Sequence, residues 1–133
     1  MATTTILPDD ILTAILEIAR QQKGVSQLAF EGHDEDLQTV FFKLAGNDKK
    51  GLLSSFVFSD AGPRPYSPVL NDSVSKLQLA GLVGRQNPDY EVVFTTAAAQ
   101  GYYEHVLSKR LSEEEKKELT EVAKEFLSLI HSM

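Results

Sequence analysis

Apolar residues recur at three- and four-residue spacing in five segments of the chain, which predicts five amphipathic helices. The first helix begins at Pro8 and ends at Gly24, and the others cover residues 34–46, 68–80, 95–110 and 112–130. The candidate core positions of the first two helices are Ile11, Leu12, Ile15, Leu16, Ala19, Leu37, Val40, Phe41 and Leu44. This pattern predicts a mainly helical domain.

Local capping signals mark where two of these helices begin. Pro8 suits the first helical position, where a backbone N–H is not needed, and Asp9 and Asp10 complement the positive end of the helix dipole. Ser67 is placed to cap the third helix with its hydroxyl, and Pro68 follows at the first helical position. The third helix therefore has a strong start signal.

Two extended segments after the third helix predict a β-hairpin. Gly81 ends the helix in a left-handed conformation, and Leu82 and Val83 open the first strand. Tyr90–Phe94 is rich in β-branched and aromatic residues, which favour a strand. The loop between the strands covers Arg85–Asp89, where an Asn-Pro dipeptide favours a turn.

Two other segments are each compatible with two kinds of structure. Val25–Phe30 is either a strand-like connector or the start of another helix. Phe56 and Phe58 have the two-residue spacing of a strand, or of an extended connector with one buried face.

The third helix has one apolar face and one polar face. Leu70, Val74 and Leu77 lie above one another on the face that we expect to be buried. The outward positions are Asp72, Ser75, Lys76 and Leu79, with Asn71 and Gln78 on the flanks. The outward face is therefore a candidate interaction surface.

The last helix is strongly amphipathic. Ser112 and Glu115 form an S-x-x-E capping box at its start. Its apolar stripe must dock either on its own domain or on a partner, and both alternatives remain open. The candidate dimerisation or partner residues are Leu119, Val122, Phe126, Leu127 and Ile130.

Length and composition indicate one domain, and the absence of cysteine agrees with a reducing compartment. The chain has 133 residues, of which 42% are hydrophobic, and no cysteine. One hydrophobic core commonly serves about 100–150 residues. No apolar run approaches the roughly 20 residues of a membrane span, and the N-terminal residues lack the features of a signal peptide. We therefore expect a cytoplasmic protein.

The net charge of −6 conceals a basic segment in the middle of the chain. Residues 49–85 carry five basic and two acidic side chains, whereas the flanking segments are acidic. Proteins bind nucleic acid without specificity by neutralising phosphates with lysine and arginine, so the acidic total argues against a generally nucleic-acid-binding surface. A local basic patch is compatible with this acidic net charge. The candidate members of the patch are Lys49, Lys50, Arg64, Lys76 and Arg85.

The sequence contains no arrangement typical of an enzyme. No G-x-S-x-G, H-E-x-x-H, P-loop or G-x-G-x-x-G motif occurs, and the three histidines stand apart. His33 lies near Glu31, Asp34 and Asp36, but loops that bind hard cations use a stricter alternation of oxygen ligands. We expect no catalytic residue, no metal and no cofactor.

The order of elements resembles a winged helix-turn-helix domain with an extra C-terminal helix. The resemblance is carried by "LQLAGLV" at the junction of the third helix with the hairpin, and by Thr95, Thr96 and Gly101 after the second strand. The segment before the third helix is similar to that of little-characterised prokaryotic winged-helix families with a Gly-Pro-Tyr-Ser turn. Here Arg64-Pro65 interrupts that turn. The resemblance covers residues 8–108, and residues 111–132 form the added docking or dimerisation helix.

This resemblance implies that the helix from Pro68 to Ala80 is a DNA-recognition helix and that residues 85–89 form the wing tip. Polar side chains on such a helix contact base edges, and basic ones contact phosphates. The implied base-contacting residues are Asn71, Ser75 and Gln78. The implied phosphate-contacting residues are Arg64, Lys76 and Arg85.

Two functions follow from this sequence, and the residues do not separate them. The first is a transcription regulator, expected to be a homodimer, that binds double-stranded DNA. The second is a winged-helix module that binds a protein partner and not DNA. Asp72 and Leu79 on the outward face suit a protein partner, because phosphate repels the carboxylate unless a cytosine amino group donates to it.

Overall fold

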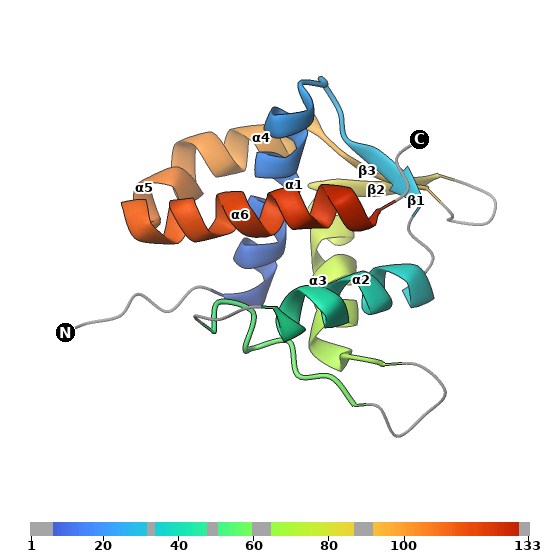
Figure 1. The fold of residues 1–133 in the computed structure, drawn as a ribbon. Coiled ribbons are helices and arrows are strands. Elements are labelled where there is room, and N and C mark those ends of the chain that lie inside the picture. The colour runs from blue at the N-terminus through green and yellow to red at the C-terminus, as the bar shows by residue number, and fades with distance from the viewer. Residues whose placement is uncertain (1–6, 32–33, 48–50, 60–64, 87–91, 131–133) are drawn as a thin grey trace.

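The computed structural model describes residues 7–31, 34–47, 51–59, 65–86 and 92–130. Its helices are α1 (Pro8–Lys23), α2 (Asp34–Gly46), α3 (Pro68–Leu79), α4 (Ala97–Tyr102), η1 (Tyr103–Leu107), α5 (Ser108–Arg110) and α6 (Glu113–Leu129). Its strands are β1 (Ala29–Glu31), β2 (Val83–Gln86) and β3 (Val92–Thr95). The predicted mainly helical α+β class is confirmed, with one small antiparallel sheet (Figure 1).

Helix α1 is the centre of the molecule. It begins at Pro8, and Gly24 ends it with a φ of 72°, as the capping signals predict. Every residue from Asp10 to Ala19 is buried, including the polar Thr13 and Glu17. The apolar pattern predicts a single buried stripe, whereas α3, α4, η1 and α6 all pack against α1.

The sheet joins two distant parts of the chain. Strands β2 and β3 form the predicted hairpin, with Gly84 opposite Phe94. Strand β1, which comes from the ambiguous Val25–Phe30 segment, pairs with β3 and places Phe30 opposite Val93. The strand order is therefore β1-β3-β2. Arg85 lies in β2 and not in the loop, because the strand is longer than the sequence pattern predicts.

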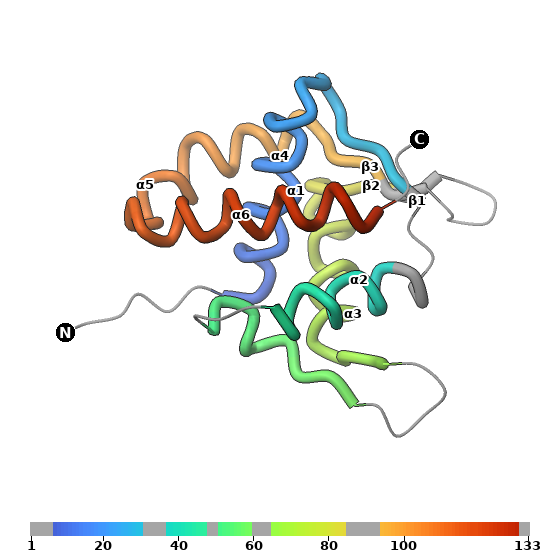
Figure 2. The backbone as a smooth tube through the Cα atoms, viewed as in Figure 1, coloured from blue at the N-terminus to red at the C-terminus, as the bar shows by residue number. Residues whose placement is uncertain are grey.

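The described residues 51–59 and 65–67 between α2 and α3 form neither a helix nor a strand of the sheet (Figure 2). Residues 52–55 form turns that bury Leu53 and Phe56 against the core. Ser59 and Tyr66 then exchange two backbone hydrogen bonds, of 2.8 and 2.9 Å, as an isolated bridge. The strand alternative for Phe56 and Phe58 is therefore wrong, and the connector alternative is confirmed.

Helix α6 docks on its own domain. Figure 1 shows α6 lying across α1, and α6 also contacts α2. Leu119, Ala123 and Phe126 are completely buried, and the Phe126 ring meets the rings of Phe30 and Phe41 edge-on at centroid distances of 5.4 and 5.8 Å.

This docking corrects part of the predicted partner surface. Leu119 and Phe126 are core residues, because burying them against α1, α2 and β1 removes their apolar area from water within one chain. Val122, Leu127 and Ile130 pack against the same core and keep part of their surface exposed.

Helix α4 begins where the sequence predicts and then changes its geometry. Thr96 caps it by accepting a hydrogen bond from the Ala99 N–H at 3.3 Å. From Tyr103 to Leu107 the chain forms one turn of π-helix, which no residue pattern indicated. Within the described residues, no helix is both long enough and apolar enough to cross a membrane.

Candidate interaction surface on helix α3

Helix α3 presents the two faces that the sequence predicts. Leu70, Val74 and Leu77 are buried, and so is Ser73. Asp72, Ser75, Lys76, Gln78 and Leu79 are exposed, and Asn71 is half-buried. Leu79 is 89% exposed, the highest exposure of any large apolar residue in the described part of the chain. The outward face of α3 is therefore accessible along the whole helix.

The N-terminus of α3 is held by a buried amide. The Gln38 side chain on α2 accepts a hydrogen bond from the Ser67 N–H at 2.7 Å and donates one to the Ser67 carbonyl at 3.0 Å. The Ser67 hydroxyl in turn accepts from the Leu70 N–H at 3.2 Å and caps the helix as predicted. Both Gln38 and Ser67 are buried, so these bonds are shielded from water.

The C-terminus of α3 is closed by the predicted glycine. Gly81 has a φ of 79°, in the left-handed region. Its N–H donates to the Gln78 carbonyl at 3.1 Å, and the Leu82 N–H donates to the Leu77 carbonyl at 2.9 Å. These two bonds form a Schellman motif, which turns the chain directly from α3 into β2.

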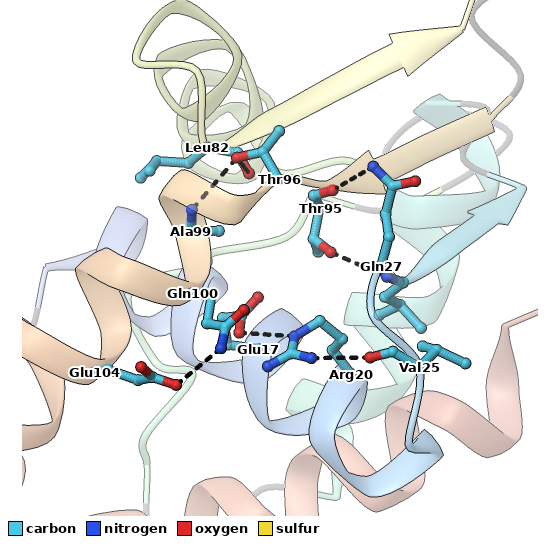
Figure 3. A network of polar contacts seen from close by, with 11 residues as sticks. Glu17, Arg20, Val25, Gln27, Leu82, Thr95, Thr96, Ala99, Gln100 and Glu104 are labelled. Atoms are coloured by element: carbon cyan, nitrogen blue, oxygen red, sulfur yellow. Dashed lines mark hydrogen bonds and ion pairs between the residues drawn. The ribbon is translucent and has the colours of Figure 1, made fainter.

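Thr95 and Thr96 connect this turn to the rest of the sheet (Figure 3). The Thr96 hydroxyl donates a hydrogen bond that is shared between two carbonyl oxygens, that of Gly81 at 2.7 Å and that of Leu82 at 3.1 Å. The buried Thr95 hydroxyl accepts from the Leu28 N–H at 3.0 Å, just before β1. The two threonines therefore fix the hairpin relative to both α3 and β1.

The charges on α3 balance. Asp72 and Lys76 are its only ionisable residues, and they lie four positions apart on the outward face. Within the described residues, the side chains of Asn71, Ser75, Lys76 and Gln78 make no hydrogen bond or ion pair with another residue. Because Ser75, Lys76 and Gln78 are exposed, their donors and acceptors are available to a ligand, whereas Asn71 is half-buried.

Two of the predicted phosphate contacts cannot be placed on this surface. Arg64 lies outside the described residues, as do Lys49 and Lys50. The backbone of Arg85 is described, opposite Val93, but its side chain is not. The structure brings together Asn71, Ser75, Lys76 and Gln78, and the proposed basic stripe with Arg64 and Arg85 stays a prediction.

A partly exposed aromatic pair, Phe42 with Phe58, was not predicted. The Phe42 ring on α2 meets the Phe58 ring edge-on, with a centroid distance of 5.6 Å. Phe42 is 41% exposed, and Tyr66, just before α3, is 44% exposed. A three- or four-residue spacing cannot show this pair, because the two rings come from a helix and from an irregular connector.

The described residues hold no group of three or more histidine, cysteine or acidic side chains placed to bind a metal ion. His33 of the candidate acidic site lies outside the described residues. Comparisons with protein-family models, with curated protein sequences and with solved structures find no match for this chain.

Proposed function

We propose that the chain is a winged helix-turn-helix domain that binds double-stranded DNA through the outward face of α3. The order of elements supports this fold. A helix pair is followed directly by the β2-β3 hairpin, and β1, which precedes α2, completes the sheet on the far side of β3. In this arrangement α3 is the recognition helix and the hairpin is the wing.

The observation that carries the DNA proposal is the solvent-directed polar face of a helix held at both ends. Asn71, Ser75 and Gln78 supply the hydrogen-bond donors and acceptors that read base edges in a major groove. Lys76 supplies a phosphate contact, and Arg64 and Arg85 are the other two proposed phosphate contacts. Because Ser67 and Gly81 fix the two ends of α3, little conformational entropy is lost when the helix enters a groove.

A low-salt binding titration with a fluorescent DNA duplex tests this function. Lys76→Glu places a negative charge at the phosphate contact, so we expect at least a tenfold loss of affinity. Lys124→Glu on α6 is the matched control, because it makes the same charge change at an exposed site outside α3. Absence of binding by the wild-type protein, or equal losses in the two variants, would reject the proposal.

Leu79 favours a second function, in which the domain binds a protein partner and not DNA. A leucine that is 89% exposed on the same face as Asp72 suits a protein partner better than a phosphate backbone. If α3 binds a second copy of the chain, light scattering should show a wild-type dimer and a Leu79→Ser monomer. A DNA-binding domain that does not use Leu79 would keep its mass after this substitution.

The proposed regulator acts in the cytoplasm as a homodimer. Its dimer contacts cannot include the buried Leu119 and Phe126 while the domain keeps this fold. The partly exposed Val122, Leu127 and Ile130 remain available for such a contact. Leu127→Glu should therefore produce a monomer in light scattering if the proposed dimer uses α6, and a dimer of unchanged mass would exclude that surface.

A further inference from the structure

Glu17 is a charged residue enclosed in the centre of the molecule. It lies on α1 and has no exposed surface. Its Oε1 atom accepts one hydrogen bond, from Arg20 Nε at 3.0 Å. Its Oε2 atom is buried and makes no hydrogen bond. Buried carboxylate oxygens in folded proteins nearly always have a partner, so this one requires an explanation.

Arg20 links this carboxylate to the connection between α1 and β1. While Nε contacts Glu17, Nη1 donates to the Val25 carbonyl at 2.8 Å (Figure 3). Val25 follows the Gly24 turn, and three residues later Leu28 exchanges hydrogen bonds with Thr95. The Arg20 guanidinium therefore adds a side-chain bond to the backbone bond from the Val25 N–H to the Arg20 carbonyl, and together they hold the end of α1 to the segment that leads into the sheet.

The other groups around Glu17 disfavour its negative charge. Glu104 of η1 adds a second negative charge nearby, and the buried Tyr103 of η1 supplies an apolar ring. Gln100 of α4 donates its amide to Glu104 at 3.1 Å. The residues that α3 and α6 direct into the core carry no charge, and they are Leu70, Ser73, Val74, Leu77, Leu119, Ala123 and Phe126. Arg20 is therefore the one cation that opposes the cost of burying the Glu17 charge among the described residues.

Burial raises the pKa of the Glu17 carboxyl above its ordinary value of 4.5, although the hydrogen bond and charge of Arg20 oppose the increase. The neighbouring Glu104 carboxylate raises it further. Burial also raises the pKa of the Tyr103 phenol, and the charge of Glu17 adds to that effect. Both directions describe a site in which a negative charge is poorly solvated.

We propose that Glu17 and Arg20 form a pH-sensitive clamp, in which proton uptake by Glu17 releases Arg20 and loosens its hold on the connection between α1 and β1. The charged carboxylate attracts the guanidinium and keeps it near Val25. The neutral acid no longer attracts it, and the Arg20 side chain, already 12% exposed, can turn toward solvent. This proposal does not depend on the function proposed for α3.

A carbon-13 NMR titration of the wild-type protein tests the clamp directly. We expect the Glu17 carboxyl signal to titrate with a midpoint above 4.5. The Arg20 Nε–H signal and the Val25 carbonyl signal should move with the same midpoint, because both report the hydrogen bonds of the guanidinium. A Glu17 midpoint at or below 4.5 would overturn the proposal, as would Arg20 and Val25 signals that do not follow it.

The Glu17→Gln variant provides a second measurement. It imitates the neutral acid, so its Arg20 and Val25 signals should lie at their low-pH positions and stay there between about pH 4.5 and 7. Glu121→Gln, an exposed substitution on α6, is the matched control and should titrate like the wild type. If Glu17→Gln kept the wild-type titration of Arg20 and Val25, another group would be responsible and the proposal would fail.

Discussion

Phe94 covers Gly84 across the β2-β3 hairpin. The two residues are direct partners in the sheet, and a β-carbon added to Gly84 would lie 2.3 Å from Cζ of the Phe94 ring. Real β-carbons do not approach other atoms so closely. The aromatic ring therefore occupies the space that any side chain at position 84 would need.

We accordingly expect Gly84→Ala to destabilise the protein by about 1–3 kcal/mol, because the ring or the strand must move to admit a methyl group. Chemical denaturation followed by circular dichroism measures this loss. Gly101→Ala is the matched control, since a β-carbon there meets nothing within 4 Å and alanine favours the helix. Equal unfolding free energies of the two variants would contradict this expectation, because the Phe94 ring would then move aside without loss of stability.

Gln38→Ala should be more damaging than its single side chain suggests. It removes both hydrogen bonds to Ser67 and leaves the buried Ser67 N–H without a partner, while the Ser67 carbonyl keeps only its bond from the Asn71 N–H at 3.2 Å. We expect a loss of about 1–3 kcal/mol in unfolding free energy. Gln22→Ala removes a similar amide bond, of 2.8 Å to the Thr120 carbonyl, at an exposed position. We expect this control to change the unfolding free energy by less than about 0.5 kcal/mol.

Phe126→Ala tests the position of α6. Because the ring is completely buried against Phe30 and Phe41, we expect a loss of about 3–5 kcal/mol in unfolding free energy. Truncation of the chain after Arg110 should then abolish cooperative thermal unfolding. If α6 served a partner alone, the truncated chain would remain folded and would change only its mass in light scattering.

Tyr102→Phe tests a polar contact between α4 and the start of α1. The Tyr102 hydroxyl donates to Asp10 Oδ1 at 2.8 Å, and Arg110 lies 3.9 Å from the other Asp10 oxygen. Loss of the hydroxyl should cost about 1 kcal/mol in denaturant unfolding. Tyr66→Phe, at an exposed position, should leave the unfolding free energy unchanged, and an equal loss there would contradict this interpretation.

The sequence by itself determined the features that depend on neighbouring residues. Ser67 with Pro68, Ser112 with Glu115, Gly24 and Gly81 start or stop their helices as predicted, because capping hydrogen bonds and left-handed turns involve only a few consecutive residues. The two faces of α3 also follow from local spacing alone. The exposed positions of Ser75, Lys76 and Gln78 and the half-buried position of Asn71 agree with that spacing, and their role as contact residues stays a prediction.

Only the tertiary structure decided the contacts between distant segments. The spacing of apolar residues shows that a helix has an apolar face, but it does not show what covers that face, so α6 could be assigned to a partner as readily as to its own domain. The pairing of β1 with β3, the Gln38 bonds to Ser67 and the burial of Glu17 each join residues with no common local pattern. They arise because every element must satisfy its polar groups and bury its apolar surface in one shared core.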